Sequence, residues 1–340
     1  MAPPSALEMV LLAISDELLL YLLSFCGLKD VFNLKATSTI VQGVVLHYQT
    51  LVWNADRFFR PWFRDGTAEF RLALRRSSAI VSGSQLVQFF DRAHYPGSDM
   101  DIFLRLGGVL PMGTWLQTQG YSRIADSTDY DLAKRVARTA CNMISRTQSG
   151  HTPVCAVIDY HRFVCSETVI YRQKIQLVAV DIDPVQHVLY DFHSTAVMNY
   201  MTDEQVVSVF PLSTFILRKS YLARSRKEGH DRSSKWKNKY QQRGFRVVHK
   251  RSRGSHNDLK QGKRTSMDRY SWTITLEGVP RSQTMYGPIV PNVRFEVMHW
   301  RTGVAYSDSF VRVAEPGIWR CLSRVRKRYP GLLDGNVGRT

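Results

Sequence analysis

The sequence lacks the features that mark a secreted, disulfide-stabilised or membrane-embedded protein. Its five cysteines are scattered, odd in number and without Cys-x-x-Cys spacing, which argues against a disulfide framework or a zinc site and fits a reducing compartment. The longest apolar stretch, residues 9–25, is interrupted by Asp16 and Glu17 and has no basic leader. We therefore expect neither a signal peptide nor a membrane span, and predict a cytosolic or nuclear protein with no membrane partner.

Hydrolase signatures are also missing. The chain has no Gly-x-Ser-x-Gly elbow and no visible internal repeat. Asp191, His193 and Ser194 stand too close together on one short segment to form a relayed catalytic triad, because consecutive side chains point apart. We exclude a serine-hydrolase interpretation and expect His193 to cap the following helix.

Acidic residues are scarce relative to basic ones, 29 against 46, which gives a formal net charge of +17 over 340 residues. The excess is concentrated in residues 218–264, where 17 Lys and Arg stand against 3 acids. Because Ser, Gly and charge dominate and apolar periodicity is poor, we expect a mobile basic insertion there. It is interpreted either as a solvated or nuclear-targeting tract or as a contact for nucleotide or nucleic-acid phosphates. Trp236, Tyr240 and Phe245 are the places for ordered anchors or base-stacking platforms.

The most informative motif pairs a Gly-Ser turn with an Asp-x-Asp. An apolar run precedes Gly83 and Ser84, and an amphipathic stretch and a Pro-Gly loop lead to Asp99 and Asp101. This order predicts a strand, a tight turn, a helix, a loop and a second strand. Ser84 would cap a helix whose free N–H groups suit an anion, and the two aspartates would share one strand face. Two carboxylates there could hold Mg²⁺ or Mn²⁺ against a triphosphate.

This combination resembles the signature of the nucleotidyltransferase superfamily. The resemblance implies that Gly83 and Ser84 hold nucleotide phosphates and that Asp99 and Asp101 bind metal. Taken separately, an Asp-x-Asp is common in solvated turns, and a Gly-Ser pair is only a turn.

Active members of that superfamily carry a third acid in mid-strand, between apolar residues. Here Gln176 takes that position, with Asp181 or Asp183 as substitutes from the strand end. A glutamine carries no negative charge and cannot bridge two cations, so the resemblance predicts a degenerate domain whose catalysis is absent or very slow. The catalytic residue stays unassigned.

The N-terminal segment predicts a helix capped by Ser15, a stop at Gly27 and a second helix from residue 28. Residues 13–53 resemble an F-box, with Asp-Glu-Leu-Leu at 16–19, Leu-x-Asp-Val at 28–31 and Leu-x-x-Thr-Ser at 34–38. The usual proline before Asp16 is replaced by Ser15. The resemblance implies binding to the Skp adaptor of a cullin-based SCF ubiquitin ligase, and the alternative is an ordinary helical cap. The expected interface leucines are Leu18, Leu19, Leu22 and Leu23.

The length suggests about two domains, and the predicted fold class is α+β. We expect an F-box-like helical module at 13–53, a mixed-sheet nucleotidyltransferase-like domain at 65–217, the basic insertion at 218–264 and C-terminal strands at 265–330. Residues 13–275 together resemble a fungal group of F-box proteins with nucleotidyltransferase-like domains. The favoured function is a substrate adaptor of an SCF-type ligase. The alternative is an active metal-dependent nucleotidyltransferase acting on RNA, protein or a small acceptor.

Overall fold

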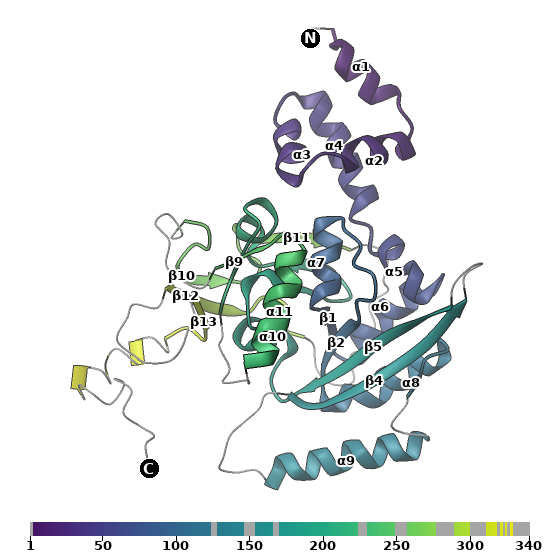
Figure 1. Ribbon diagram of the computed structural model, residues 1–340, viewed down its shortest axis with the longest axis vertical. Coiled ribbons are helices and arrows are strands. Elements are labelled where there is room, and N and C mark those ends of the chain that lie inside the picture. The colour runs from purple at the N-terminus through teal and green to yellow at the C-terminus, as the bar shows by residue number, and fades with distance from the viewer. Residues whose placement is uncertain are drawn as a thin grey trace. The chain divides into compact units, whose positions relative to one another are not determined.

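The computed structural model places the chain in two compact units (Figure 1). It describes residues 3–123, 128–145, 154–165, 170–223, 230–248, 257–276, 289–299, 311–317, 320, 321, 324, 327 and 328. Unit 1 comprises Met1–Thr67 with Gln88–Pro96, and unit 2 comprises Ala68–Val87 with Gly97–Thr340. Helices and a mixed sheet are both present, so the predicted α+β class is confirmed. Within the described part of the chain, every helix is too short or too polar to cross a membrane.

Unit 1 is a small helical bundle (Figure 1). Its helices are α1 (Ala6–Ala13), α2 (Asp16–Ser24), α3 (Leu28–Lys35), α4 (Thr39–Val52) and α5 (Ala55–Phe63), and α7 (Ser84–Asp91) continues into it from unit 2. Ser15 caps α2 as predicted, because its hydroxyl accepts a hydrogen bond from the Leu18 N–H at 3.4 Å. Gly27 is the N-cap of α3, where the second helix was expected to start.

The bundle is held by an apolar core and by one arginine. One cluster of this core comes from α2, α3 and α4 and contains Leu19, Leu23, Val31, Val41, Val44, Val45 and Tyr48. The Arg92 guanidinium donates hydrogen bonds to the backbone oxygens of Leu23 at 3.0 Å and Cys26 at 2.7 Å. These contacts hold the end of α2 and the turn that follows it against the segment after α7.

Unit 2 is built on an eight-stranded mixed sheet with the order β11-β7-β6-β1-β2-β5-β4-β3. The strands are β1 (Ala79–Ser82), β2 (Met100–Arg105), β3 (Ser122–Arg123), β4 (Val154–Cys165), β5 (Ile170–Val180), β6 (Asn199–Met201), β7 (Gln205–Ser208) and β11 (Trp272–Thr275). The pair β2 and β5 is parallel, and the other neighbouring pairs of this sheet are antiparallel.

Unit 2 also contains helices, some of which contact strands of this sheet. They are α6 (Thr67–Arg76), α8 (Val109–Thr118), α9 (Asp129–Ser145), α10 (Pro184–Asp191) and α11 (His230–Gln242), with short helical turns at Leu106–Gly108, Thr195–Val197 and Leu212–Ile216. Val185 and Val188 of α10 join Ile80, Phe103 and Val178 of the sheet in one buried core. Asp183 is the N-cap of α10.

Two smaller sheets complete unit 2. The first has the order β10-β12-β13, with β10 (Gly262–Thr265), β12 (Arg294–His299) and β13 (Val311–Ala314). The second pairs β8 (Lys219–Tyr221) with β9 (Arg246–Val248). β11, β12 and β13 are strands within the range 265–330, where C-terminal strands were expected.

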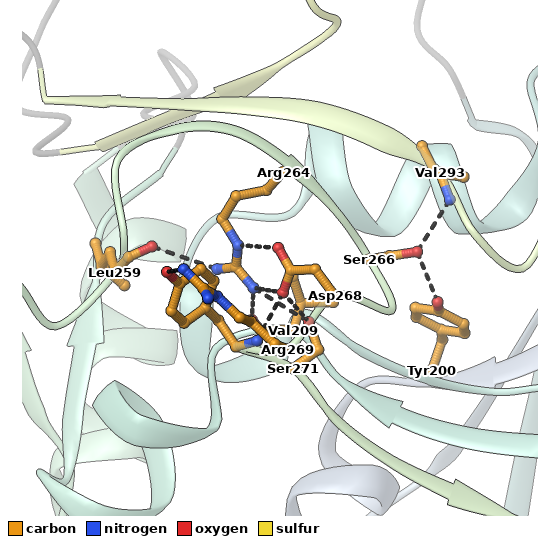
Figure 2. A network of polar contacts seen from close by, with 10 residues as sticks. Tyr200, Val209, Leu259, Arg264, Ser266, Asp268, Arg269, Ser271 and Val293 are labelled. Carbon is orange, nitrogen blue, oxygen red and sulfur yellow. Dashed lines mark hydrogen bonds and ion pairs between the residues drawn. The ribbon is translucent and has the colours of Figure 1, made fainter.

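Arg264 ties the three-stranded sheet to the main one (Figure 2). The side chain is 3% exposed, and its Nη2 donates to the Val209 carbonyl at 3.0 Å and to Asp268 at 2.9 Å. Burial acts to raise the pKa of Asp268, but hydrogen bonding and charge from Arg264 outweigh it and hold that pKa below its usual range. Removing one member of a buried ion pair typically costs about 3–5 kcal/mol, because the other charge is left uncompensated.

The expectation of one mobile insertion at 218–264 is corrected. β8, α11 and β9 lie within that range and are regular elements. Phe245 is buried, with its ring centroid 6.0 Å from that of Tyr240. The basic tracts at 224–229 and 249–256 fall outside the described residues.

Candidate functional site

The predicted Gly-Ser turn connects β1 to α7 and lies against the Asp101 side chain. Gly83 has φ +76°, a left-handed conformation that a residue with a Cβ adopts only with strain. A Cβ on Gly83 would stand 2.5 Å from Asp101 Oδ2, well inside contact distance. Ser84 begins α7, and Ser82 pairs with Asp101 across β1 and β2. The order strand, turn, helix and strand predicted from the sequence is therefore confirmed.

One face of the sheet changes from apolar to polar along β2 and β5. Phe103 and Val178 belong to the core that contains α10. Two residues earlier on these strands, Asp101 and Gln176 lie on the same face, because side chains alternate along a strand. They are direct partners in the parallel register. The polar part of this face forms the floor of the candidate site.

Asp101 is a carboxylate in an unfavourable environment. Burial first, and the Asp99 charge second, raise the pKa of Asp101 to about 7, while Lys239 and Lys174 act to lower it. The Asp99 side chain is more open, with 41% of it exposed. At neutral pH Asp101 is thus divided between its protonated and charged forms, and the two aspartates influence each other electrostatically.

Gln176 lies where the sequence predicted the missing third acid, between Asp101 on β2 and Asp159 on β4. Its Nε2 donates a hydrogen bond to Asp159 Oδ1 at 2.8 Å. The sequence reasoning missed Asp159. The signal was present, because Asp159 stands in mid-strand between the apolar Ile158 and Tyr160, the pattern expected of the third acid.

Lys174 limits how well the polar floor of the site could bind a metal ion. Its Nζ lies 3.1 Å from Asp159 Oδ2 and 3.6 Å from Asp99 Oδ2. The carboxylates that would have to hold a pair of divalent ions already face an ammonium group and the Gln176 amide. Among the described residues, no group of three or more His, Cys, Asp or Glu side chains is arranged to hold a metal ion. The residues fit a two-ion centre poorly, and Mg²⁺ or Mn²⁺ at Asp99 and Asp101 stays a prediction.

Asp181 and Asp183 do not replace the third acid. Both follow the end of β5, at least five residues beyond Gln176, which corresponds to about 16 Å along a strand. Asp183 Oδ1 instead accepts hydrogen bonds from the backbone N–H groups of Val185 at 2.9 Å and Gln186 at 3.3 Å. The expectation is corrected: Asp183 is a helix cap.

A pocket of about 220 Å³ opens at this site. Its lining residues are Gly83, Ser84, Asp101, Phe192, His193, Val197, Trp236, Lys239 and Tyr240. The last three come from α11, inside the segment expected to be a mobile loop. Trp236 and Tyr240, predicted as anchors or stacking platforms, therefore lie in the pocket wall, whereas Lys239 was not singled out by the sequence.

His193 is part of an aromatic wall. Its ring stacks on Trp236 with centroids 4.1 Å apart and planes at 26°. Burial first, and Lys239 second, lower the pKa of His193 to about 4, so the imidazole is neutral at physiological pH. Its Nδ1 is buried and has no hydrogen-bond partner among the described residues. Asp191 pairs with His187 at 3.2 Å, which agrees with the exclusion of a triad.

The four leucines expected at an adaptor interface divide into two pairs. Leu19 and Leu23 are core residues of unit 1, with 3% and 5% of their surface exposed. Leu18 and Leu22 are 53% and 46% exposed. Only Leu18 and Leu22 are free to contact a partner in this structure, which narrows the expected interface.

Comparison of this chain with family models, with curated proteins and with solved structures finds no match. The function is therefore inferred from the residues and their geometry.

Gly83→Ala should reduce the free energy of unfolding by about 3 kcal/mol, because it adds a contact with Asp101 to the strain of a left-handed backbone. Gly97→Ala is the matched control. Gly97 also has a positive φ, of 68°, but a Cβ there would meet nothing within 4 Å, so we expect a loss of about 1 kcal/mol.

Urea unfolding of both variants and of Gly83→Ala with Asp101→Ala measures the difference. Removing the Asp101 carboxylate should recover part of the stability lost in Gly83→Ala, since the free-energy effects of substituting two residues in contact are not additive. Equal losses in the two glycine variants, or strict additivity in the double variant, would contradict the close approach.

Asp101 should make stability fall as pH rises from about 4 to 7. Its folded pKa of about 7 lies above the ordinary value of 3.8, so the native state binds more protons than the unfolded state in that window. Asparagine at position 101 carries no charge at any pH. Relative to wild type, the free energy of unfolding of Asp101→Asn should therefore rise by up to about 4 kcal/mol between pH 4 and pH 8. Urea unfolding of both proteins across this range measures the gain, with the exposed Asp65→Asn as control. A constant difference between wild type and Asp101→Asn would rule out the raised pKa.

Proposed function

We propose that this protein is a substrate adaptor of an SCF-type ubiquitin ligase. Unit 1 binds a Skp-type adaptor, through which it joins the cullin, and unit 2 recognises the target or a ligand. The F-box-like segments of the sequence motivate the proposal. The observation that carries it is the apolar outer surface of α2.

This surface is unusual for a helix in water. Leu18, Tyr21, Leu22 and Phe25 are each between 46% and 72% exposed, and the rings of Tyr21 and Phe25 meet edge to face at 5.0 Å. Since the opposite side of α2 already supplies the core, these side chains add nothing to the interior of unit 1. A contiguous exposed apolar surface of this kind marks a protein interface.

The neighbouring helix α1 extends the apolar character. Leu7, Met9, Val10 and Leu12 are each more than half exposed. α1 has a complete capping box, in which Ser5 and Glu8 bond to each other's backbone. Glu8 also accepts a hydrogen bond from Ser38 at the start of α4. The apolar helix is therefore fixed to the bundle and available to the same partner.

Leu18→Asp with Leu22→Asp should abolish capture of a Skp adaptor by the full-length chain, because two carboxylates would be buried in an apolar interface. Both positions are exposed, so the variant should fold. The control is Leu110→Asp, which changes an exposed leucine in the first turn of α8 in unit 2.

Pull-down with purified Skp adaptor, together with circular dichroism of each variant, makes the measurement. Equal recovery of the Skp adaptor by wild type and by the double variant would contradict the adaptor proposal. Failure of wild type to bind the Skp adaptor would also contradict it.

The second candidate is metal-dependent nucleotidyl transfer, favoured by the Asp101 carboxylate that lies directly against the Gly83 turn. We prefer binding without catalysis, because Gln176 supplies no charge and Lys174 neutralises the acids beside it. Two-metal chemistry depends on carboxylates that fix both ions.

We expect wild type not to incorporate labelled nucleotide into RNA, protein or small acceptors, with Mg²⁺ or Mn²⁺. Gln176→Asp with Lys174→Gln should permit at most slow incorporation, and Asp101→Asn in that background should remove it. Robust turnover by wild type that disappears in Asp101→Asn would establish the second candidate in place of the first.

A further inference from the structure

The hairpin formed by β4 and β5 continues beyond the strands that flank it (Figure 1). β2 pairs with β5 only from Ile175 onwards, and β3 pairs with β4 only at Tyr160 and His161. The four outer pairs of the hairpin join residues 162–165 to residues 170–173. We call these pairs the outer ribbon, and no other strand of the described chain lies beside it. Free strand edges of this kind can pair with another chain.

One face of the outer ribbon exposes apolar side chains to water. Phe163 and Ile170 are 71% and 69% exposed. Phe163 is the direct partner of Arg172, and Cys165 is the direct partner of Ile170. Because partners across a strand pair and residues two apart on a strand share a face, these four side chains lie on the same side. Exposed apolar side chains on a strand pair with free edges indicate an interaction surface.

The opposite face of the outer ribbon is fixed to the body of unit 2. Arg162 donates hydrogen bonds to the Gln119 carbonyl at 3.0 Å and to Gln173 Oε1 at 2.8 Å. The Tyr121 hydroxyl donates to the same Gln173 oxygen at 3.0 Å, and the guanidinium carbon of Arg162 lies 4.5 Å from the centroid of the Tyr121 ring. The outer ribbon is therefore held in place with its Phe163 face open, which lowers the entropic cost of binding a partner.

The charge on the open face favours an acidic partner. Arg172 is exposed and has no ion pair or hydrogen bond with any residue that the structure describes. The acids farther along this face are already engaged, since Lys174 Nζ lies 3.1 Å from Asp159 and 3.6 Å from Asp99. A carboxylate of a partner could therefore form charge-assisted hydrogen bonds with the free guanidinium. A second copy of this chain, with its net charge of +17, would instead be repelled.

We propose that the outer ribbon is a docking site for an extended acidic segment of a target protein, with Arg172 as the carboxylate contact and Phe163 and Ile170 as the apolar contacts. The segment adds along the free edge of β5, so its acid and its apolar residue stand two positions apart. Main-chain hydrogen bonds give affinity in such strand addition, and alternate side chains give specificity. The inference rests on the proposed role of unit 2 in target recognition and is independent of Skp binding.

Fluorescence anisotropy with the full-length protein and labelled octapeptides tests the proposal. The peptides have the sequence Thr-X-Thr-Glu-Thr-X-Thr-Glu, where X is Val, Leu or Phe, and matched peptides carry Gln or Lys in place of Glu. At least one Glu peptide should bind. Its Gln counterpart should bind about tenfold more weakly, a difference of about 1.4 kcal/mol, because it lacks the charge-assisted contact. The Lys counterpart should not bind.

Arg172→Glu should reverse this preference, so that the Lys peptide binds and the Glu peptide does not. Phe163→Thr should weaken binding of the Glu peptide about tenfold, because apolar surface is no longer buried. Tyr171→Thr, at an exposed residue on the opposite face of the outer ribbon, and Lys29→Gln on α3 are the controls and should leave binding unchanged. All four positions are exposed, so circular dichroism should report folded protein.

Glu-peptide binding that persists in Arg172→Glu and is lost only on adding salt would show general attraction to a basic chain and overturn the proposal. Failure of every peptide to bind would also overturn it, while the Skp pull-down would still report on unit 1. A dimer in analytical ultracentrifugation that Phe163→Thr dissociates would assign the outer ribbon to a second copy of this chain instead.

Discussion

The candidate site depends on the approach of the Gly83 backbone to the Asp101 carboxylate. Ser82 and Asp101 are opposite partners on β1 and β2, so the chain must leave β1 directly over the aspartate. Only a residue without a side chain can make that turn, since a Cβ would stand 2.5 Å from Asp101 Oδ2. The start of α7 and the close cover over Asp101 both follow from this one contact.

Burial of Asp101 sets the electrostatic requirements of everything around it. A carboxylate with a pKa near 7 needs nearby positive charge to stay ionised, and Lys239 and Lys174 provide it. Lys174 comes from β5 in the floor, whereas Lys239 comes from α11 in the wall. For Lys239, burial first and Arg243 second lower its pKa, and Asp101 and Asp99 act to raise it. Acids and lysines of this site thus stabilise each other's charged forms.

Local sequence patterns predicted the parts of the site that local geometry determines. The turn at Gly83 and the strand at Asp101 are separated by one helix, so residue type and spacing were sufficient. Asp159 and Lys174 depend instead on the pairing of β4 with β5 and of β5 with β2. A register is a long-range property, and a shift of one residue would have turned both side chains to the other face.

The two other misjudged features have the same origin. α11 has few apolar residues, because only the part of its surface that carries Trp236 and Tyr240 faces the rest of unit 2. Its high charge content therefore resembled that of a mobile loop. In α2, two stripes of leucines spaced four apart, one through Leu18 and one through Leu19, are equally periodic. Periodicity indicates that a stripe exists, but the packing of α3 and α4 decides which one becomes core. The other stripe stays exposed, so the same packing that stabilises the bundle also decides which apolar surface of α2 is left open to solvent.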